Sequence, residues 1–177
     1  MKLTKTSFKD LVIIKHNLFE DNRGVFKEKY KIQELEKCIN YEINFCQQNY
    51  VKSFKNVLRG LHFQKEPYAQ SKLISVDFGK ILDVVVDIRK DSHTYGKYFK
   101  RILDSDSNES LFIPKGLAHG YLTLSEYAVI SYHVDNYYKP EFEEGILYND
   151  SSIKIDWEID HSKLIISEKD KNQKAFK

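Results

Sequence analysis

The feature that most constrains the fold is a succession of short runs rich in β-branched and aromatic residues, separated by turn residues. Their spacing is typical of a β-sandwich or β-barrel. Composition agrees, because 12 Tyr and 11 Phe stand against only 3 Pro and 7 Gly, and flat side chains suit a pleated surface. We expect strands at Leu11–Ile14, Val25–Tyr30, Ile43–Tyr50, Val57–Phe63, Lys72–Phe78, Ile81–Ile88, Ser110–Ile113, Tyr121–Leu124 and Val129–Val134.

Helices are expected only as accessories to this β-structure. Lys31–Cys38 carries apolar residues three positions apart, and a short C-terminal piece is the other candidate. Asp77–Lys80 lies between two apolar runs and contains Gly79, so a tight hairpin is predicted there. The polar stretch Asp104–Glu109 predicts an exposed turn. With no repeat and no linker, residues 1–177 are expected to form one domain.

The charge balance excludes several classes of partner. The formal net charge is only +2, from 28 Lys plus Arg and 26 Asp plus Glu, so neither nucleic acid nor an anionic membrane surface is an expected partner. No apolar run approaches the ~18 residues of a membrane span, and the N-terminal residues do not resemble a signal peptide. We expect a cytoplasmic protein in which Cys38 and Cys46 are free thiols.

Strand alternation places two polar side chains on apolar faces. In Lys72–Phe78, Lys72 shares its face with Ile74. In Val129–Val134, Tyr132 points to the same side as Ile130. The structural alternatives are a lysine whose ammonium reaches water at the strand end and a tyrosine that is merely packed. Both residues are therefore candidates for a site, and their alternatives remain open at this level.

Two further segments place histidines near turns. Around Gly60, alternation puts His62 and Gln64 on one face and sends Arg59 to the other, unless a bulge at Gly60 re-aims the arginine. The stretch Pro114–His119 has the form P-x-G-x-x-H, in which Pro and Gly shape a turn and His119 precedes the next strand. A single histidine of this kind is more often a hydrogen-bonded core residue than a ligand.

Together these two segments resemble the half-motifs of the cupin double-stranded β-helix. Further motifs, in order and with matching gaps, resemble the dTDP-4-dehydrorhamnose 3,5-epimerase family from about residue 7 to Trp157, and loosely to Ser167–Asp170. The resemblance implies an all-β cupin jelly-roll barrel with short accessory helices. The motifs are Asp21-Asn22-Arg23-Gly24, Gln47-Gln48-Asn49, Asn56–Gln64, Lys72-Leu73, Asp83–Arg89, Ile113–Gly120, Leu124-Ser125-Glu126, Asn136-Tyr137-Tyr138 and Tyr148-Asn149-Asp150.

The resemblance also implies roles for individual residues. His62 would be the general base and Tyr132 the general acid, on opposite faces of a sugar ring, with Asp170 orienting His62. Lys72 and His119 would lie near the sugar and its C4 oxygen. The remaining positions that correspond to nucleotide or sugar contacts are Arg23, Glu28, Gln47, Asn49, Arg59, Tyr138, Glu143 and Lys169.

Epimerisation beside a ketone needs such a set of residues. A carbon-bound proton is removed to give an enolate, and a proton returns from the other face, so two opposed acid–base groups are required. A neutral histidine suits the first role and a protonated tyrosine the second. No cofactor is expected. No metal is expected either, because metal-binding cupins present H-x-H where this chain has His62 followed by Gln64, and amides are poor ligands for metals that favour imidazole.

The expected ligand is a nucleotide-diphosphate 4-keto sugar of the dTDP-4-dehydro-6-deoxyglucose type, used in deoxysugar and surface polysaccharide synthesis. Three alternatives remain open: a single-site 3-epimerase, a 3,4-ketoisomerase, which would usually show a second histidine near the first, and a sugar-nucleotide-binding cupin without turnover. The resemblance implies a homodimer, and residues 11–50 carry more β-rich sequence than one small barrel needs. Arg23 or Glu28 is then expected to complete the partner's site.

Overall fold

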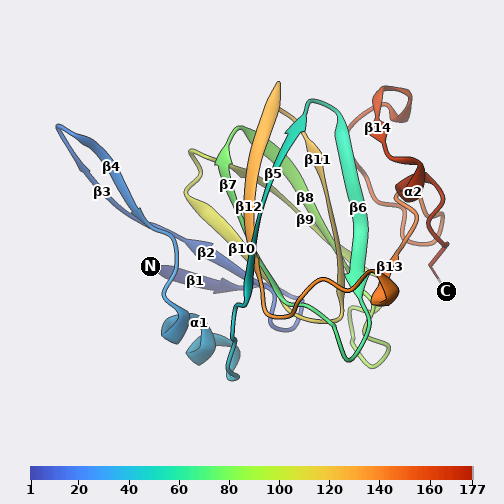
Figure 1. The fold of residues 1–177 in the computed structure, drawn as a ribbon, viewed down its shortest axis with the longest axis horizontal. Coiled ribbons are helices and arrows are strands. Elements are labelled where there is room, and N and C mark those ends of the chain that lie inside the picture. The colour runs from blue at the N-terminus through green and yellow to red at the C-terminus, as the bar shows by residue number, and fades with distance from the viewer. Residues whose placement is uncertain (177) are drawn as a thin grey trace.

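The computed structural model describes residues 1–176, in which two β-sheets face each other (Figure 1). The first sheet contains, in spatial order, β1 (Lys2–Lys5), β2 (Val12–Lys15), β10 (Glu109–Ile113), β7 (Lys72–Phe78), β12 (Tyr127–Val134) and β5 (Gln47–Phe54). The second contains β13 (Glu143–Gly145), β6 (Val57–Gln64), β11 (Leu117–Thr123), β8 (Lys80–Asp87) and β9 (Tyr98–Asp104), with β14 (Ile165–Ile166) parallel to β6. The expected all-β jelly-roll barrel is confirmed.

The other elements lie around this barrel. A two-stranded hairpin projects away from it (Figure 1), and the helical elements are short, as expected. They are β3 (Asn17–Asp21), β4 (Gly24–Glu28), α1 (Ile32–Ile39), the 3-10 helices η1 (Pro140–Phe142) and η2 (His161–Lys163), and α2 (Glu168–Lys171).

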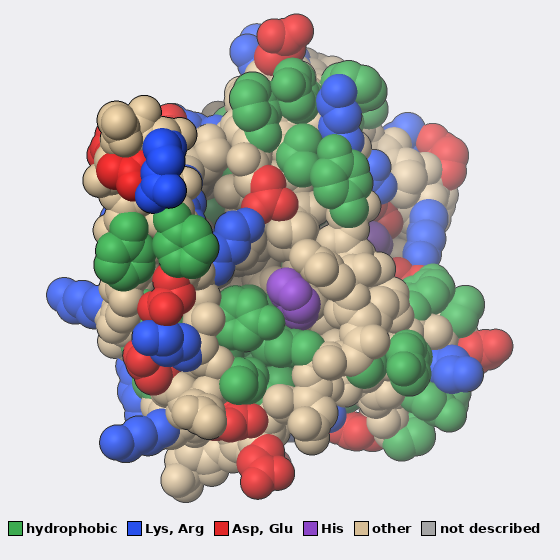
Figure 2. Space-filling view, turned by 60° about the vertical axis from the view of Figure 1, so that its left-hand side comes forward, with side chains coloured by type: hydrophobic (Ala, Val, Ile, Leu, Met, Phe, Trp, Pro, Cys, Tyr) green, Lys and Arg blue, Asp and Glu red, His purple; other side chains and the backbone are tan. Residues whose placement is uncertain are grey.

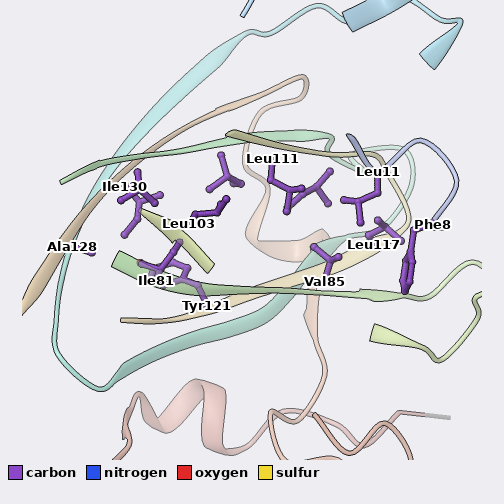
Figure 3. Packing of buried hydrophobic residues seen from close by; sticks show 13 residues of the cluster. Phe8, Leu11, Ile81, Val85, Leu103, Leu111, Leu117, Tyr121, Ala128 and Ile130 are labelled. Atoms are coloured by element: carbon purple, nitrogen blue, oxygen red, sulfur yellow. The ribbon is translucent and has the colours of Figure 1, made fainter. Parts of the chain in front are cut away.

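The main core lies between the two sheets. Inward side chains such as Ile130 of the first sheet and Val85 of the second are almost fully buried and belong to one cluster, as Figure 3 shows. Outside the barrel, Leu35 of α1 packs against the first sheet, and Trp157 packs against the outer side chains of the second. Both sheets are therefore covered on parts of their outer faces as well as packed against each other.

Most of the expected strands form, with some differences in their bounds. The turn between β9 and β10 is confirmed. A tight turn also forms at Asp77–Lys80, where Gly79 has φ +77°, but the hairpin expected there is wrong, because β7 and β8 belong to different sheets and pair with other strands. The strand expected at Tyr121–Leu124 begins four residues earlier, at Leu117, so His119 lies within β11 and not before it. The strand expected at Ile43–Tyr50 is Gln47–Phe54 instead. Strands β1, β3, β9, β13 and β14 were not expected.

A bulge in β6 settles the direction of Arg59. His62 pairs with His119, but Arg59 pairs with Tyr121, so Gly60 and Leu61 together face the single residue between those partners. Gly60 has φ +109°, and a Cβ there would lie 2.6 Å from the Gly120 Cα. The position therefore requires glycine. Strict alternation was wrong here, because the extra residue turns Arg59 into the cavity that His62 lines.

The surface agrees with the nearly neutral charge. Figure 2 shows charged side chains of both signs interspersed over one face, with groups of hydrophobic side chains exposed between them. Cys38 and Cys46 are free, as expected. Within residues 1–176, no helix has the length and apolar character needed to traverse a lipid bilayer.

Candidate active site

Two adjoining cavities open into the barrel, with volumes of about 300 Å³ and about 310 Å³. His62, Lys72 and Tyr132 line both of them. His62 comes from β6 in the second sheet, whereas Lys72 of β7 and Tyr132 of β12 come from the first. The histidine and the tyrosine therefore stand on opposite walls, at the point where the two cavities meet.

The structure brings nearly all the expected site residues to these cavities. The first cavity adds Arg59, His119, Lys169 and Asp170, and the second adds Gln47, Asn49, Tyr138 and Glu143. Arg23 and Glu28 are the exceptions, since they lie on the projecting β3–β4 hairpin and line neither cavity.

His62 is held by a carboxylate from the C-terminal part of the chain. Its Nε2 lies 2.6 Å from Oδ1 of Asp170, whose other oxygen accepts the Gly60 backbone N–H at 3.1 Å. Asp170 is 3% exposed and sits in the first turn of α2, where Ser167 caps the helix. Burial by itself raises the pKa of Asp170, but the hydrogen bond with His62 reverses this and keeps that pKa below its usual value.

Tyr132 is partly buried, and its hydroxyl is protonated near neutral pH, as the ordinary pKa of tyrosine already requires. Burial raises the pKa of its hydroxyl, and the side chain of Asn49 opposes this only in part. Nearby, the Tyr138 hydroxyl donates to Glu143 at 2.6 Å, which raises the pKa of Tyr138 to about 12. Lys169 donates to the same carboxylate oxygen. The second cavity thus has a rim of paired charges, whereas Tyr132 offers a neutral donor further in.

Lys72 does not extend its ammonium into water as the structural alternative required. It lines both cavities, and no carboxylate lies within ion-pair distance of it among residues 1–176. Burial lowers its pKa to about 8, although the more distant Glu143 and Asp83 counteract part of the effect. The cation is poorly solvated, so it would interact strongly with negative charge that develops beside it.

The sequence and the architecture match one family over nearly the whole chain. Residues 5–177 match the family model described as dTDP-4-dehydrorhamnose 3,5-epimerase. The chain belongs to this epimerase family.

Individual relatives cover the same length. The chain is 44% identical over 170 residues to dTDP-4-dehydrorhamnose 3,5-epimerase of Escherichia coli, which covers 96% of this chain and 91% of that protein. The crystal structure of the Elizabethkingia anophelis enzyme superposes with a TM-score of 0.96 at 45% identity, covering 99% of this chain and 96% of the other. The Legionella pneumophila enzyme, solved in complex with dTDP-4-keto-L-rhamnose, has a TM-score of 0.93 at 37% identity, with coverage of 98% and 92%. The expected cupin fold is confirmed.

In this member of the epimerase family, a second buried acid–histidine pair lies below the first cavity. His119 Nε2 is 2.8 Å from Oδ2 of Asp83, which is fully buried. Sequence reasoning assigned His119 but not its partner, because the two residues belong to different strands. The available signal was an acidic residue at an inward position of the apolar β8 strand, between Ile81 and Val85.

The burial of Lys72 predicts a pH-dependent cost to stability. Its folded-state pKa of about 8 lies below the ordinary 10.5. The charged lysine therefore destabilises the fold by up to about 3 kcal/mol at pH values below about 8, and this cost fades as pH rises from about 8 to 10.5. We expect Lys72→Met to raise the free energy of unfolding at pH 7. Denaturant unfolding at pH 7 and pH 10 measures the effect.

The matched control is Lys80→Met, which alters an exposed lysine at the start of β8. It should leave the free energy of unfolding nearly unchanged at both pH values. A Lys72→Met protein that is less stable than the wild type at pH 7 would show that the ammonium is well solvated in the folded protein.

Proposed function

We propose that the protein inverts C3 and C5 of a nucleotide-linked 4-keto-6-deoxyhexose of the dTDP-4-dehydro-6-deoxyglucose type. The observation that carries this is the placement of His62 and Tyr132 on opposite walls of one cavity, with the buried Lys72 beside them. Family membership and the keto sugar bound by the Legionella relative support this substrate class.

In the proposed reaction, His62 removes the proton from the carbon next to the ketone. Its Nε2 is bound to Asp170, so Nδ1 is the ring nitrogen that takes the proton, and the carboxylate stabilises the imidazolium that forms. The electrons of the C–H bond move to the C4 oxygen, where Lys72 and His119 are the available donors. Tyr132 then returns its proton to the same carbon from the other face. Exchange with solvent restores both groups for the second centre.

The structure favours this reading over the ketoisomerase alternative. A ketoisomerase would usually have a second histidine close to His62, but the corresponding side chain is Gln64. Its amide nitrogen donates to the Tyr68 carbonyl at 2.6 Å, and its oxygen accepts from the Lys139 backbone N–H at 2.6 Å. Gln64 therefore braces two loops beside the second cavity and is not free to act on substrate.

A panel of nucleotide 4-keto sugars incubated in D₂O and followed by NMR tests the proposal. We expect deuterium at both C3 and C5, together with inversion at both. Binding without exchange would identify a non-catalytic binder, and exchange at C3 alone would identify a single-site epimerase. Because no metal or cofactor is proposed, the rates should be unchanged after treatment with a chelator and dialysis.

We also propose that the protein acts as a homodimer in which each copy completes the other's site. The β3–β4 hairpin projects from the barrel (Figure 1) and carries Arg23 and Glu28 away from its own cavities. An extended hairpin with large exposed apolar side chains is typical of a protein interface. These side chains are Leu18 at 44%, Phe19 at 57%, Val25 at 53% and Phe26 at 67% exposure.

A complementation experiment tests the dimer and the role of Arg23 together. Chains carrying Arg23→Ala and chains carrying His62→Ala each form impaired homodimers. In the mixed dimer, the Arg23→Ala chain keeps His62 and receives Arg23 from its partner, so one of two sites is intact. We expect about half of the wild-type activity in purified, differentially tagged heterodimers. If Arg23 served its own chain's site, or if the protein were monomeric, the mixture would show no recovery.

A further inference from the structure

Arg59 differs from the other three arginines of the chain. Arg23, Arg89 and Arg101 each form an ion pair with a carboxylate, but Arg59 has no carboxylate partner among residues 1–176. Instead its Nε donates to the hydroxyl of Ser53 at 3.0 Å. The Ser53 hydroxyl lies 2.9 Å from the hydroxyl of Tyr121.

The two hydroxyl residues form a rigid support. Ser53 is 1% exposed, and Tyr121, which also lines the first cavity, is 6% exposed, so bulk water has little access to either side chain. Ser53 comes from β5 in the first sheet, and Tyr121 from β11 in the second. The contact between the two hydroxyls therefore joins the two sheets next to the Arg59 guanidinium.

The choice of neutral groups matters for what Arg59 can bind. A carboxylate would fix the guanidinium but would also neutralise it, whereas hydroxyls fix its Nε edge and leave the positive charge uncompensated. The two terminal nitrogens, Nη1 and Nη2, stay available as a fork that matches two oxygens of one phosphate. Burial also raises the pKa of Tyr121, so its hydroxyl stays protonated.

We propose that Ser53 and Tyr121 are positioning residues that hold Arg59 for bidentate contact with one phosphate of a nucleoside diphosphate. The inference rests on the proposed function, because that function supplies the nucleotide. Arg59 faces the first cavity through the bulge at Gly60, and the hydroxyl pair fixes the remaining freedom of its side chain. Neither Ser53 nor Tyr121 has a part in proton transfer.

Calorimetric titration with dTDP, together with steady-state kinetics, tests this proposal. We expect Ser53→Ala to weaken dTDP binding and raise KM roughly tenfold, the effect of losing one hydrogen bond to a charged group, while kcat stays near the wild-type value. Tyr121→Phe should act in the same direction more weakly. Ser53→Asp should weaken binding further, because the new carboxylate neutralises Arg59.

A double-mutant cycle separates positioning from a direct or merely structural role. If Ser53 acts through Arg59, then Ser53→Ala should have no further effect on dTDP affinity in an Arg59→Ala background. Additive effects would overturn the inference, as would a Ser53→Ala protein that binds dTDP like the wild type. The control is Ser131→Ala, which alters a buried serine of β12 that lines neither cavity and should leave affinity unchanged.

The two proposals fail in different ways. If the wild-type protein does not bind dTDP, then the proposed function is wrong about the nucleotide. If the wild type binds dTDP and exchanges substrate protons, but the Ser53 variants match it, only the positioning role is wrong. Should Ser53→Asp fail to fold, which circular dichroism would show, the smaller Ser53→Ala change and the cycle still decide the question.

Discussion

His62→Ala should abolish deuterium incorporation at both C3 and C5 while the protein stays folded. His62 is the imidazole that faces the junction of the two cavities with a buried carboxylate behind it. Loss of a positioned general base costs about 10²–10⁴-fold in rate, and here both centres depend on the same base. NMR in D₂O measures the exchange at each carbon separately.

Two comparisons make this result specific. Asp170→Asn should also slow exchange strongly. In the wild type, Oδ1 of the Asp170 carboxylate lies 2.6 Å from Nε2 of His62, and a neutral amide in its place would not stabilise the imidazolium. His93→Ala removes a histidine whose Nε2 contacts the backbone carbonyl of Ser7, far from either cavity, and should exchange like the wild type. Exchange at the wild-type rate in His62→Ala would end the proposed mechanism.

Tyr132→Phe should separate exchange from inversion. Without the phenol, His62 can still remove a proton and return one on its own face, so deuterium enters without a change of configuration. We expect the rate of inversion to fall by roughly 10²-fold or more, while the rate of deuterium uptake falls much less. The measurement compares the rate of deuterium uptake with the rate of product formation in the same NMR samples.

Other outcomes for Tyr132→Phe have distinct meanings. If exchange and inversion fall together with unchanged circular dichroism and nucleotide affinity, Tyr132 acts earlier, in supporting the oxyanion. If inversion continues at the wild-type rate, another group such as Tyr138 is the acid. Tyr138→Phe is the matched control, and because its hydroxyl is engaged by Glu143, we expect that change to affect binding more than inversion.

The sequence was informative wherever strand periodicity alone decides direction. The two-residue period correctly placed Lys72 and Tyr132 toward the interior, because both lie in regular strands with apolar neighbours on the same face. The same period gave the wrong direction for Arg59, because the extra residue in β6 lies between Arg59 and His62 and turns the two side chains to the same face. The presence of Gly60 indicated that a bulge could occur but not that it does.

Other features depend on contacts that no local pattern records. Strand β9 was missed because Lys100 and Arg101 give it a polar appearance, which an edge strand tolerates. Asp83 could be identified as an unusual buried acid, but its pairing with His119 depends on strand order. Asp170 was assigned only through the family resemblance, because nothing in its own short helix predicts contact with His62.

The position of Asp170 near the C-terminus also separates the pairing of the barrel strands from the formation of the His62–Asp170 pair. His62 and its carboxylate are 108 residues apart, and the strands of both sheets other than the two-residue β14 are complete at Gly145. During translation, a nascent chain can therefore pair the strands that carry His62, Lys72 and Tyr132 before the segment that brings Asp170, and with it part of the first cavity's lining, has been made. A chain that ended before residue 167 would keep these strands but lack Ser167, Lys169 and Asp170, three of the residues that line the first cavity.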